Sequence, residues 1–128
     1  MTVPLPPKPA AIPEKPKTLL EKDVEKRVCA YAKTLGFWHK KFLSPNARAV
    51  PDRIFKIRGL DFFFIEFKRP GKAEKFPADE HERAQLREHE RIREAGGEVW
   101  LVDDVEGGKR LLRSLKLLAG QTTGTTRC

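Results

Sequence analysis

Two acidic residues and a lysine have the types and spacing of a site that acts on phosphate esters. Glu66 and Lys68 lie two residues apart in a β-prone run, so in an extended strand their side chains project from one face. Asp52 begins the preceding β-prone run. Two carboxylates held close together repel each other unless a cation lies between them, and oxygen ligands suit Mg²⁺ or Mn²⁺. A lysine beside them can orient water and offset charge on a phosphoryl group, which predicts metal-dependent phosphodiester hydrolysis.

The length of the turn decides which residue faces Asp52. An antiparallel hairpin is expected because the runs that begin at Asp52 and Asp61 are separated by a short turn segment. A Gly59–Leu60 turn places Asp52 opposite Phe67, whereas a turn one residue longer places it opposite Glu66. Either register brings Asp52 beside Glu66. The same spacing also fits an ordinary solvated pair on an edge strand.

Helices and strands around the hairpin follow from the periodicity of apolar residues. Helices are expected over 18–35, 79–95 and 109–118, and further strands over 37–42 and 98–102. Thr18 and Glu21 fit a capping box at the start of the first helix. The order αβββαβα predicts an α/β fold with a mixed sheet flanked by helices. The helix between the third and fourth strands can cross over the sheet, so those two strands should be parallel.

Composition indicates one domain with a polyanionic partner. The 128 residues carry 26 Lys and Arg against 18 Asp and Glu, a net charge of +8, which favours nucleic acid. We expect a folded unit over 18–118, a flexible Pro-rich tail over 1–17 and a flexible tail over 119–128. Cys29 and Cys128 form neither a disulfide framework nor a zinc-ligand pattern, and no segment has the length of an apolar membrane span.

Three short motifs resemble a known nuclease family. Pro51-Asp52 followed by Glu66-Phe67-Lys68 is the signature of the PD-(D/E)XK superfamily, whose restriction-endonuclease-like core is αβββαβ. More narrowly, segments 41–45, 50–53 and 65–71 resemble the VRR-NUC family of phage and bacterial replication-repair nucleases, over about residues 18–103. The sequence departs from that pattern at Ala49, where the family usually has glycine, and in the longer loop 69–83.

This resemblance implies roles for individual residues. Asp52, Glu66 and the Phe67 carbonyl would bind Mg²⁺ or Mn²⁺, and Lys68 would assist the attacking water. The family's glutamine matches Gln85.

The family also places a glutamate on the first helix. Glu25 is favoured over Glu21 for this position, as a catalytic residue and a possible metal ligand, because Glu21 is better explained by the capping box. The two glutamates lie four residues apart on one helical face.

Other polar and aromatic residues receive weaker assignments. His39, His81 and His89 do not form a convincing ligand set, and the helix histidines are expected to be solvated. Trp38 and Trp100 are expected to lie in the core or at an interface. The basic residues near the site in sequence are candidates for phosphate contacts. They are Lys40, Lys41, Arg48, Arg53, Arg69 and Lys72.

By this resemblance the function would be structure-selective cutting of branched DNA, such as a Holliday junction, in replication, recombination or repair. A small single-site domain would need a homodimer to cut two strands symmetrically. The cytoplasm of a bacterial cell or phage-infected host is the expected location. A non-selective endonuclease for linear DNA and a non-catalytic nucleic-acid-binding module are the alternatives.

Overall fold

A computed structural model of the chain describes residues 19–45 and 49–123. Its elements follow in the order α1 (Glu21–Thr34), β1 (Trp38–Lys41), β2 (Arg53–Ile57), β3 (Leu60–Phe67), the 3₁₀ turn η1 (Ala73–Lys75), α2 (Glu80–Glu94), β4 (Glu98–Val102) and α3 (Val105–Thr123). The strands form one sheet in the order β1-β2-β3-β4. β3 pairs with β2 antiparallel and with β4 parallel, because α2 carries the chain across the sheet between β3 and β4. The predicted α/β class with a mixed, helix-flanked sheet is confirmed.

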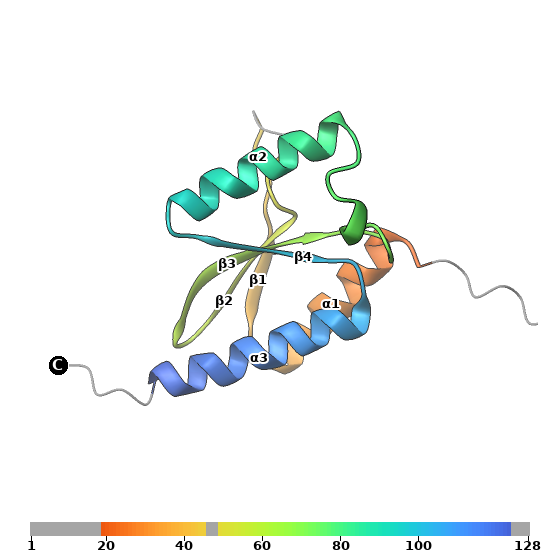
Figure 1. Cartoon of the computed structure of the whole chain (residues 1–128). Helices are drawn as coiled ribbons and strands as arrows, with labels where there is room; N and C mark the ends of the chain where they lie inside the picture. Colours follow the sequence, from red (N-terminus) through yellow and green to blue (C-terminus); the bar gives the residue numbers. More distant parts are fainter. Residues whose placement is uncertain (1–18, 46–48, 124–128) are drawn as a thin grey trace, which may run out of the picture.

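The helices cover the two faces of the sheet unequally. Figure 1 shows α2 on one face and α1 with α3 on the other. Alternate residues of β3 point towards α1 and α3, and Phe63, Ile65 and Phe67 are buried there against Val28 of α1 and Leu112 of α3. The core therefore lies on the α1 and α3 side, which leaves the opposite face of β3 for Glu66.

The β2–β3 hairpin contains a bulge that sets its register. The turn consists of Arg58 and Gly59, because Ile57 pairs with Leu60, and Gly59 has a φ of 93°. Both predicted turns were therefore wrong. The register shifts by one residue before the Phe55–Phe63 pair, so β3 carries an extra residue at this point.

This bulge affects Asp52. From the turn alone, regular pairing would place Asp52 opposite Ile65. With the bulge, Arg53 pairs with Ile65. Because the strands are antiparallel, the residue before Arg53 then faces the residue after Ile65, so Asp52 lies opposite Glu66. The longer of the two predicted turns gave this same pairing.

Two helices, α1 and α3, have boundaries that differ from the expectation. α1 begins at Glu21, where the Asp23 carboxylate accepts a hydrogen bond of 3.0 Å from the Leu20 N–H, and Thr18 lies outside the described residues. α3 begins at Val105, four residues earlier than expected, and Asp104 caps it by accepting a 2.8 Å hydrogen bond from the Gly107 N–H. It also continues to Thr123, into the segment expected to be a flexible tail. Segments 1–17 and 124–128 lie outside the described residues.

Neither tryptophan belongs to the core. Trp38 is 48% exposed and packs edge-to-face against Phe62, while Trp100 is 37% exposed on β4. Their positions on the two edge strands explain this exposure. In the part of the chain that the structure describes, no helix is both long and apolar enough to cross a membrane.

Candidate active site

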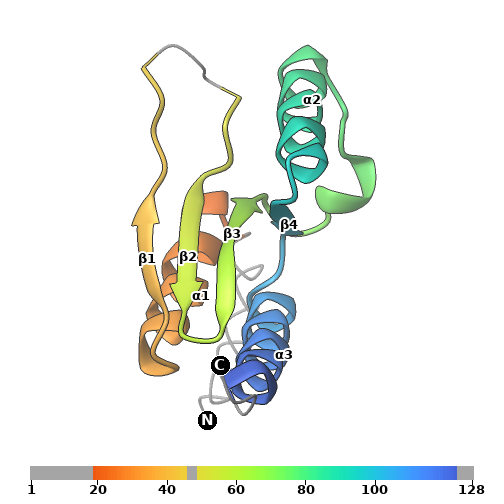
Figure 2. The same ribbon diagram turned by 90° about the vertical axis from the view of Figure 1, so that its left-hand side faces the viewer.

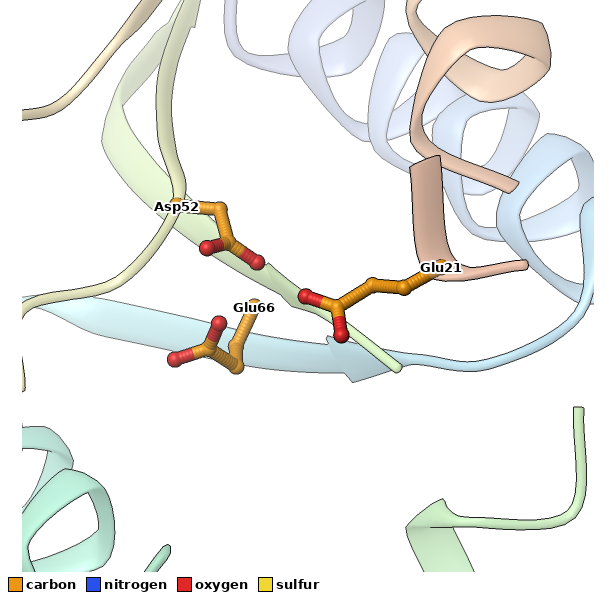
Figure 3. A group of neighbouring side chains, drawn as sticks. All are labelled: Glu21, Asp52 and Glu66. Carbon is orange, nitrogen blue, oxygen red and sulfur yellow. The ribbon is translucent and has the colours of Figure 1, made fainter. Parts of the chain in front are cut away.

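Three carboxylates from three separate elements converge beside β3. Glu21 is the first residue of α1, Asp52 directly precedes β2, and Glu66 lies near the end of β3. Each offers an oxygen within 4.8 Å of the other two. Figure 3 shows the Glu21 and Asp52 side chains pointing towards each other, with Glu66 beside them. Such a set of hard oxygen atoms is the kind that binds Mg²⁺ or Mn²⁺.

Glu66 is fully buried and only partly satisfied. Its Oε1 accepts a 2.9 Å hydrogen bond from Gln85 Nε2 and lies 3.5 Å from His89 Nε2. Its Oε2 is buried without a hydrogen-bond partner among the described residues. Burial, and then the adjacent Asp52 carboxyl, raises the pKa of Glu66 to about 10, so this group is protonated at neutral pH in the absence of a cation.

Asp52 is held in place by backbone hydrogen bonds on both sides. One carboxylate oxygen accepts a 2.7 Å hydrogen bond from the Phe67 N–H, and the Asp52 carbonyl accepts one of 2.8 Å from the Phe42 N–H. These contacts fix Asp52 across the end of β3. Burial and the neighbouring Asp52 also raise the pKa of Glu21. The charge of Asp52 therefore disfavours the ionised form of Glu21 where the fold places the two groups.

Lys68 occupies a buried pocket beside these carboxylates. Its ammonium donates to Gln85 Oε1 at 2.8 Å, forms a 2.8 Å ion pair with Glu82, and lies 5.2 Å from the centre of the Phe76 ring. Gln85 therefore contacts Lys68 with its oxygen and Glu66 with its amide nitrogen. These two bonds fix the orientation of the Gln85 amide and connect Lys68 to the buried carboxyl group.

The face of α2 that carries Gln85 holds two more residues of the site, neither predicted as functional from the sequence. Glu82 and His89 flank Gln85 at spacings of three and four residues, which places all three on one helical face. His89 is 2% exposed, so the expectation of a solvated histidine was wrong. Phe76 of the long 69–83 loop stacks on its ring with centroids 5.7 Å apart. Burial lowers the pKa of His89 to about 4, so the ring is neutral at neutral pH.

The spacing of the polar residues on α2 was the one signal in the sequence that could have indicated that Glu82, Gln85 and His89 share a face. The burial of His89 depends on the loop above it, whose N–H groups at Gly71 and Ala73 each donate a 3.0 Å hydrogen bond to Asp103. A contact of this kind between distant segments has no local pattern in the sequence.

The structure places Glu21, rather than Glu25, with the other carboxylates. Glu25 forms a 2.5 Å ion pair with Arg53, one helical turn further along α1. The first turn of α1 lies at the end of the sheet where Asp52 and Glu66 meet, so only the first residue of the helix reaches them. Arg53 in turn contacts His39 at 3.2 Å.

The basic candidates for phosphate contacts fall in different places. Arg69 and Lys72 line a cavity of ≈ 170 Å³ together with Glu21, Lys68 and Glu82. Lys40 and Lys41 are exposed on the edge strand β1. Arg53 is engaged with Glu25, and Arg48 lies outside the described residues.

The donor set fits a divalent cation. A cation beside Glu66 would give its unsatisfied Oε2 a partner and would favour its ionised form, while also relieving the repulsion from Asp52 and Glu21. The site can therefore bind a metal ion, and the residues themselves do not distinguish Mg²⁺ from Mn²⁺.

Comparison with known proteins relates the chain to a phage nuclease. No protein-family model matches the chain. The "Putative nuclease p44" of Acyrthosiphon pisum secondary endosymbiont phage 1 is 32% identical to it over 87 residues, which are 68% of this chain and 86% of the phage protein. The chain belongs to this nuclease family. Membership supports nuclease activity in general.

Proposed function

We propose that this nuclease-family chain is a Mg²⁺- or Mn²⁺-dependent DNA endonuclease of the VRR-NUC type. The observation that supports this most directly is the convergence of Glu21, Asp52 and Glu66 within 4.8 Å. The buried, unsatisfied Oε2 of Glu66 and the adjacent Lys68, held by Gln85, extend that observation from an acidic cluster to a site for hydrolysis.

The three carboxylates would hold the metal, with the Phe67 carbonyl as a further ligand implied by the resemblance to VRR-NUC proteins. A divalent ion bound there neutralises charge on the phosphate and makes water more acidic. Lys68 would orient the attacking water and stabilise the charge that develops on the phosphoryl oxygens. Gln85 would hold the Lys68 ammonium at a fixed position relative to Glu66.

For the substrate we propose branched DNA, cut by a homodimer. One chain has one such carboxylate cluster among its described residues, so two symmetric cuts require two copies of the chain. An endonuclease acting on linear DNA would use the same site, and a comparison of substrates separates the two activities.

The direct test is cleavage of Holliday junction, flap, duplex and single-stranded DNA with Mg²⁺, Mn²⁺ or EDTA. We expect cleavage with either metal, none in EDTA, and the highest rate on a branched substrate. Equal rates on junction and duplex would remove the proposed selectivity. An absence of cleavage with both metals on all four substrates would refute the endonuclease function and favour a binding module.

The metal assignment is tested by Asp52→Asn. Loss of one anionic ligand should weaken Mn²⁺ binding, measured by calorimetry, by about tenfold or more, because even neighbours of metal ligands contribute on that scale. DNA affinity in EDTA should be retained, since the change removes an anion beside the phosphate. Asp61→Asn, at an exposed position on the same hairpin, is the matched control and should bind Mn²⁺ normally. Unchanged Mn²⁺ affinity in Asp52→Asn would contradict the assignment.

A further inference from the structure

A groove of ≈ 610 Å³ lies between α1 and the edge strand β1. Figure 2 shows α1 behind β1 and β2, and α1 contacts β1 directly. We call this groove the lysine groove. Its lining residues are Lys22, Asp23, Glu25, Lys26, Cys29, Ala30, Lys33, His39, Lys41 and Arg53.

The charge of the lysine groove is positive after its internal contacts are taken into account. The lining has five cationic side chains and two acidic ones; Glu25 is paired with Arg53, while Asp23 accepts a hydrogen bond from the Leu20 N–H and keeps its negative charge. The remaining cations are four exposed lysines, none of which forms an ion pair with a carboxylate in residues 19–45 or 49–123. A row of lysines without acidic partners attracts a polyanion because each neutralised phosphate releases a counterion.

One end of the groove lies in the first turn of α1, which also carries Glu21 of the acidic cluster. Lys22 lines the groove and directly follows Glu21, whereas Glu21, Asp52 and Glu66 are not part of its lining. Lys33, in the last turn of α1, marks the other end. The eleven residue-to-residue steps from Lys22 to Lys33 span about 16 Å along the helix axis, which matches about five phosphates of one B-form strand.

The β1 side of the groove contributes residues from one face of the strand. Lys41 and His39 pair with Arg53 and Phe55, and directly opposite residues project from the same face of a sheet. That face is the one covered by α1, because Phe55 belongs to the core there. The groove is open along β1 because this strand is an edge of the sheet.

We propose, on the basis of the endonuclease function above, that the lysine groove binds the sugar-phosphate backbone of the DNA strand beside the scissile phosphate. The strand would follow α1 from Lys33 to Lys22 and reach the carboxylates at Glu21. Lys22, Lys26, Lys33 and Lys41 would contact phosphates, while Arg53 neutralises Glu25 and removes its repulsion. The groove shares no lining residue with the cavity that Arg69 and Lys72 line beside Glu21.

The test compares two double variants that remove equal charge. Lys26→Ala/Lys33→Ala changes the groove, and the control Arg110→Ala/Lys116→Ala changes exposed residues of α3. Binding of a fluorescent DNA duplex is measured by anisotropy in EDTA over a range of salt concentrations. We expect the groove variant to bind about tenfold more weakly, with a salt dependence reduced by about two phosphate contacts, and the control to resemble the wild type. Circular dichroism checks that both variants remain folded.

A small substrate separates this inference from the endonuclease function. Bis(p-nitrophenyl) phosphate reaches the carboxylates without occupying the groove, so the groove variant should hydrolyse it with Mn²⁺ at the wild-type rate. Equal loss of DNA binding in the two double variants would overturn the proposal that the lysine groove binds DNA. Tighter binding of an RNA duplex of the same sequence would also overturn it. If the wild type hydrolyses neither DNA nor the small diester, the endonuclease function fails, while the anisotropy experiment still decides whether the groove binds DNA.

Discussion

Glu66 is a carboxyl group that is fully buried in the protein without a bound cation. The free energy of the metal-free protein therefore includes the cost of keeping a titratable group away from water beside Asp52. Gln85 satisfies one oxygen of Glu66 and leaves the other without a partner. A cation bound at this cluster would give that second oxygen a partner.

The pH dependence of stability should show this cost. The pKa of Glu66 rises from an ordinary 4.5 to about 10 in the folded state, so between these values the folded chain holds a proton that the unfolded chain has released. The unfolding free energy in EDTA should therefore fall as pH rises through this window. Glu66→Gln should be more stable than the wild type at pH 8, on the order of 1–3 kcal/mol, with a flatter pH profile.

Urea denaturation in EDTA at several pH values measures this difference. Glu94→Gln, at an exposed position of α2, is the control and should follow the wild type. Identical pH profiles for Glu66→Gln and the wild type would show that Glu66 is ionised in the folded metal-free protein. Saturating Mn²⁺ should reverse the order, because the wild type gains stability from its ligand.

Lys68 should act on the rate of reaction. Lys68→Ala is expected to lower single-turnover DNA cleavage by ~10² or more, because a charge acting on the transition state is lost, while Mn²⁺ affinity changes little. Lys68→Arg should restore little activity, since a planar guanidinium does not fit the compact pocket between Gln85, Glu82 and Phe76. Lys75→Ala removes an exposed lysine of the nearby loop and serves as the control. Near wild-type cleavage by Lys68→Ala would contradict the proposed role.

For single residues, the sequence predicts which side chains share a face of one strand better than it predicts which side chains of different elements meet. Alternation along β3 was enough to place Glu66 and Lys68 on one face. The choice between Glu21 and Glu25 could not be predicted from the sequence, because both share a helical face. The orientation of α1 against the sheet decides which of them reaches Asp52.

Among the elements, α1 and α3 approach each other closely at Gly108. A Cβ atom added there would lie 2.6 Å from Val28 Cγ2 and 3.0 Å from Val102 Cγ1, both in buried side chains. Gly108 therefore permits the contact that packs the two helices on the sheet.

Gly108→Ala should destabilise the protein by on the order of 1–3 kcal/mol, because the overpacking at Val28 exceeds the gain in helix propensity. The matched control is Gly120→Ala, in the same helix, where an added Cβ has no atom within 4 Å. That change should stabilise the chain by up to about 1 kcal/mol. Thermal unfolding of both variants measures the difference, and a stabilised Gly108→Ala would show that the helices separate easily.

The best-predicted elements have strong local signals. α2 lacks proline and glycine and ends before Gly96, and β4 is a short β-prone run, so both were predicted at or within one residue of their observed bounds. The end of α3 was harder to predict because its last residues are polar or glycine. Its packing against α1 is a tertiary effect that local composition does not contain.

Across the whole molecule, the site is an assembly of distant segments. Glu21 and His89 are separated by most of the folded chain, and both lie beside Glu66 of β3, which pairs parallel with β4. The sequence predicted this topology because a crossover helix permits only one simple arrangement. It did not predict the lysine groove, because the lysines belong to α1 and β1 and gain their common face only after these elements pack.

The bulge in β3 makes the hairpin tolerant of a change in length at one place. Asp61 and Phe62 together face Lys56, and both are exposed. Loss of one of these two residues would convert the bulge into regular pairing and keep Asp52 opposite Glu66. Loss of the residue between Phe63 and Ile65 would instead shift the pairing by one residue, so that Asp52 no longer lies opposite Glu66. The side chains of β3 beyond the deletion would then project from the opposite face of the sheet. In an alignment of relatives, a gap at 61–62 is therefore compatible with an intact site, whereas a gap two residues later marks its loss.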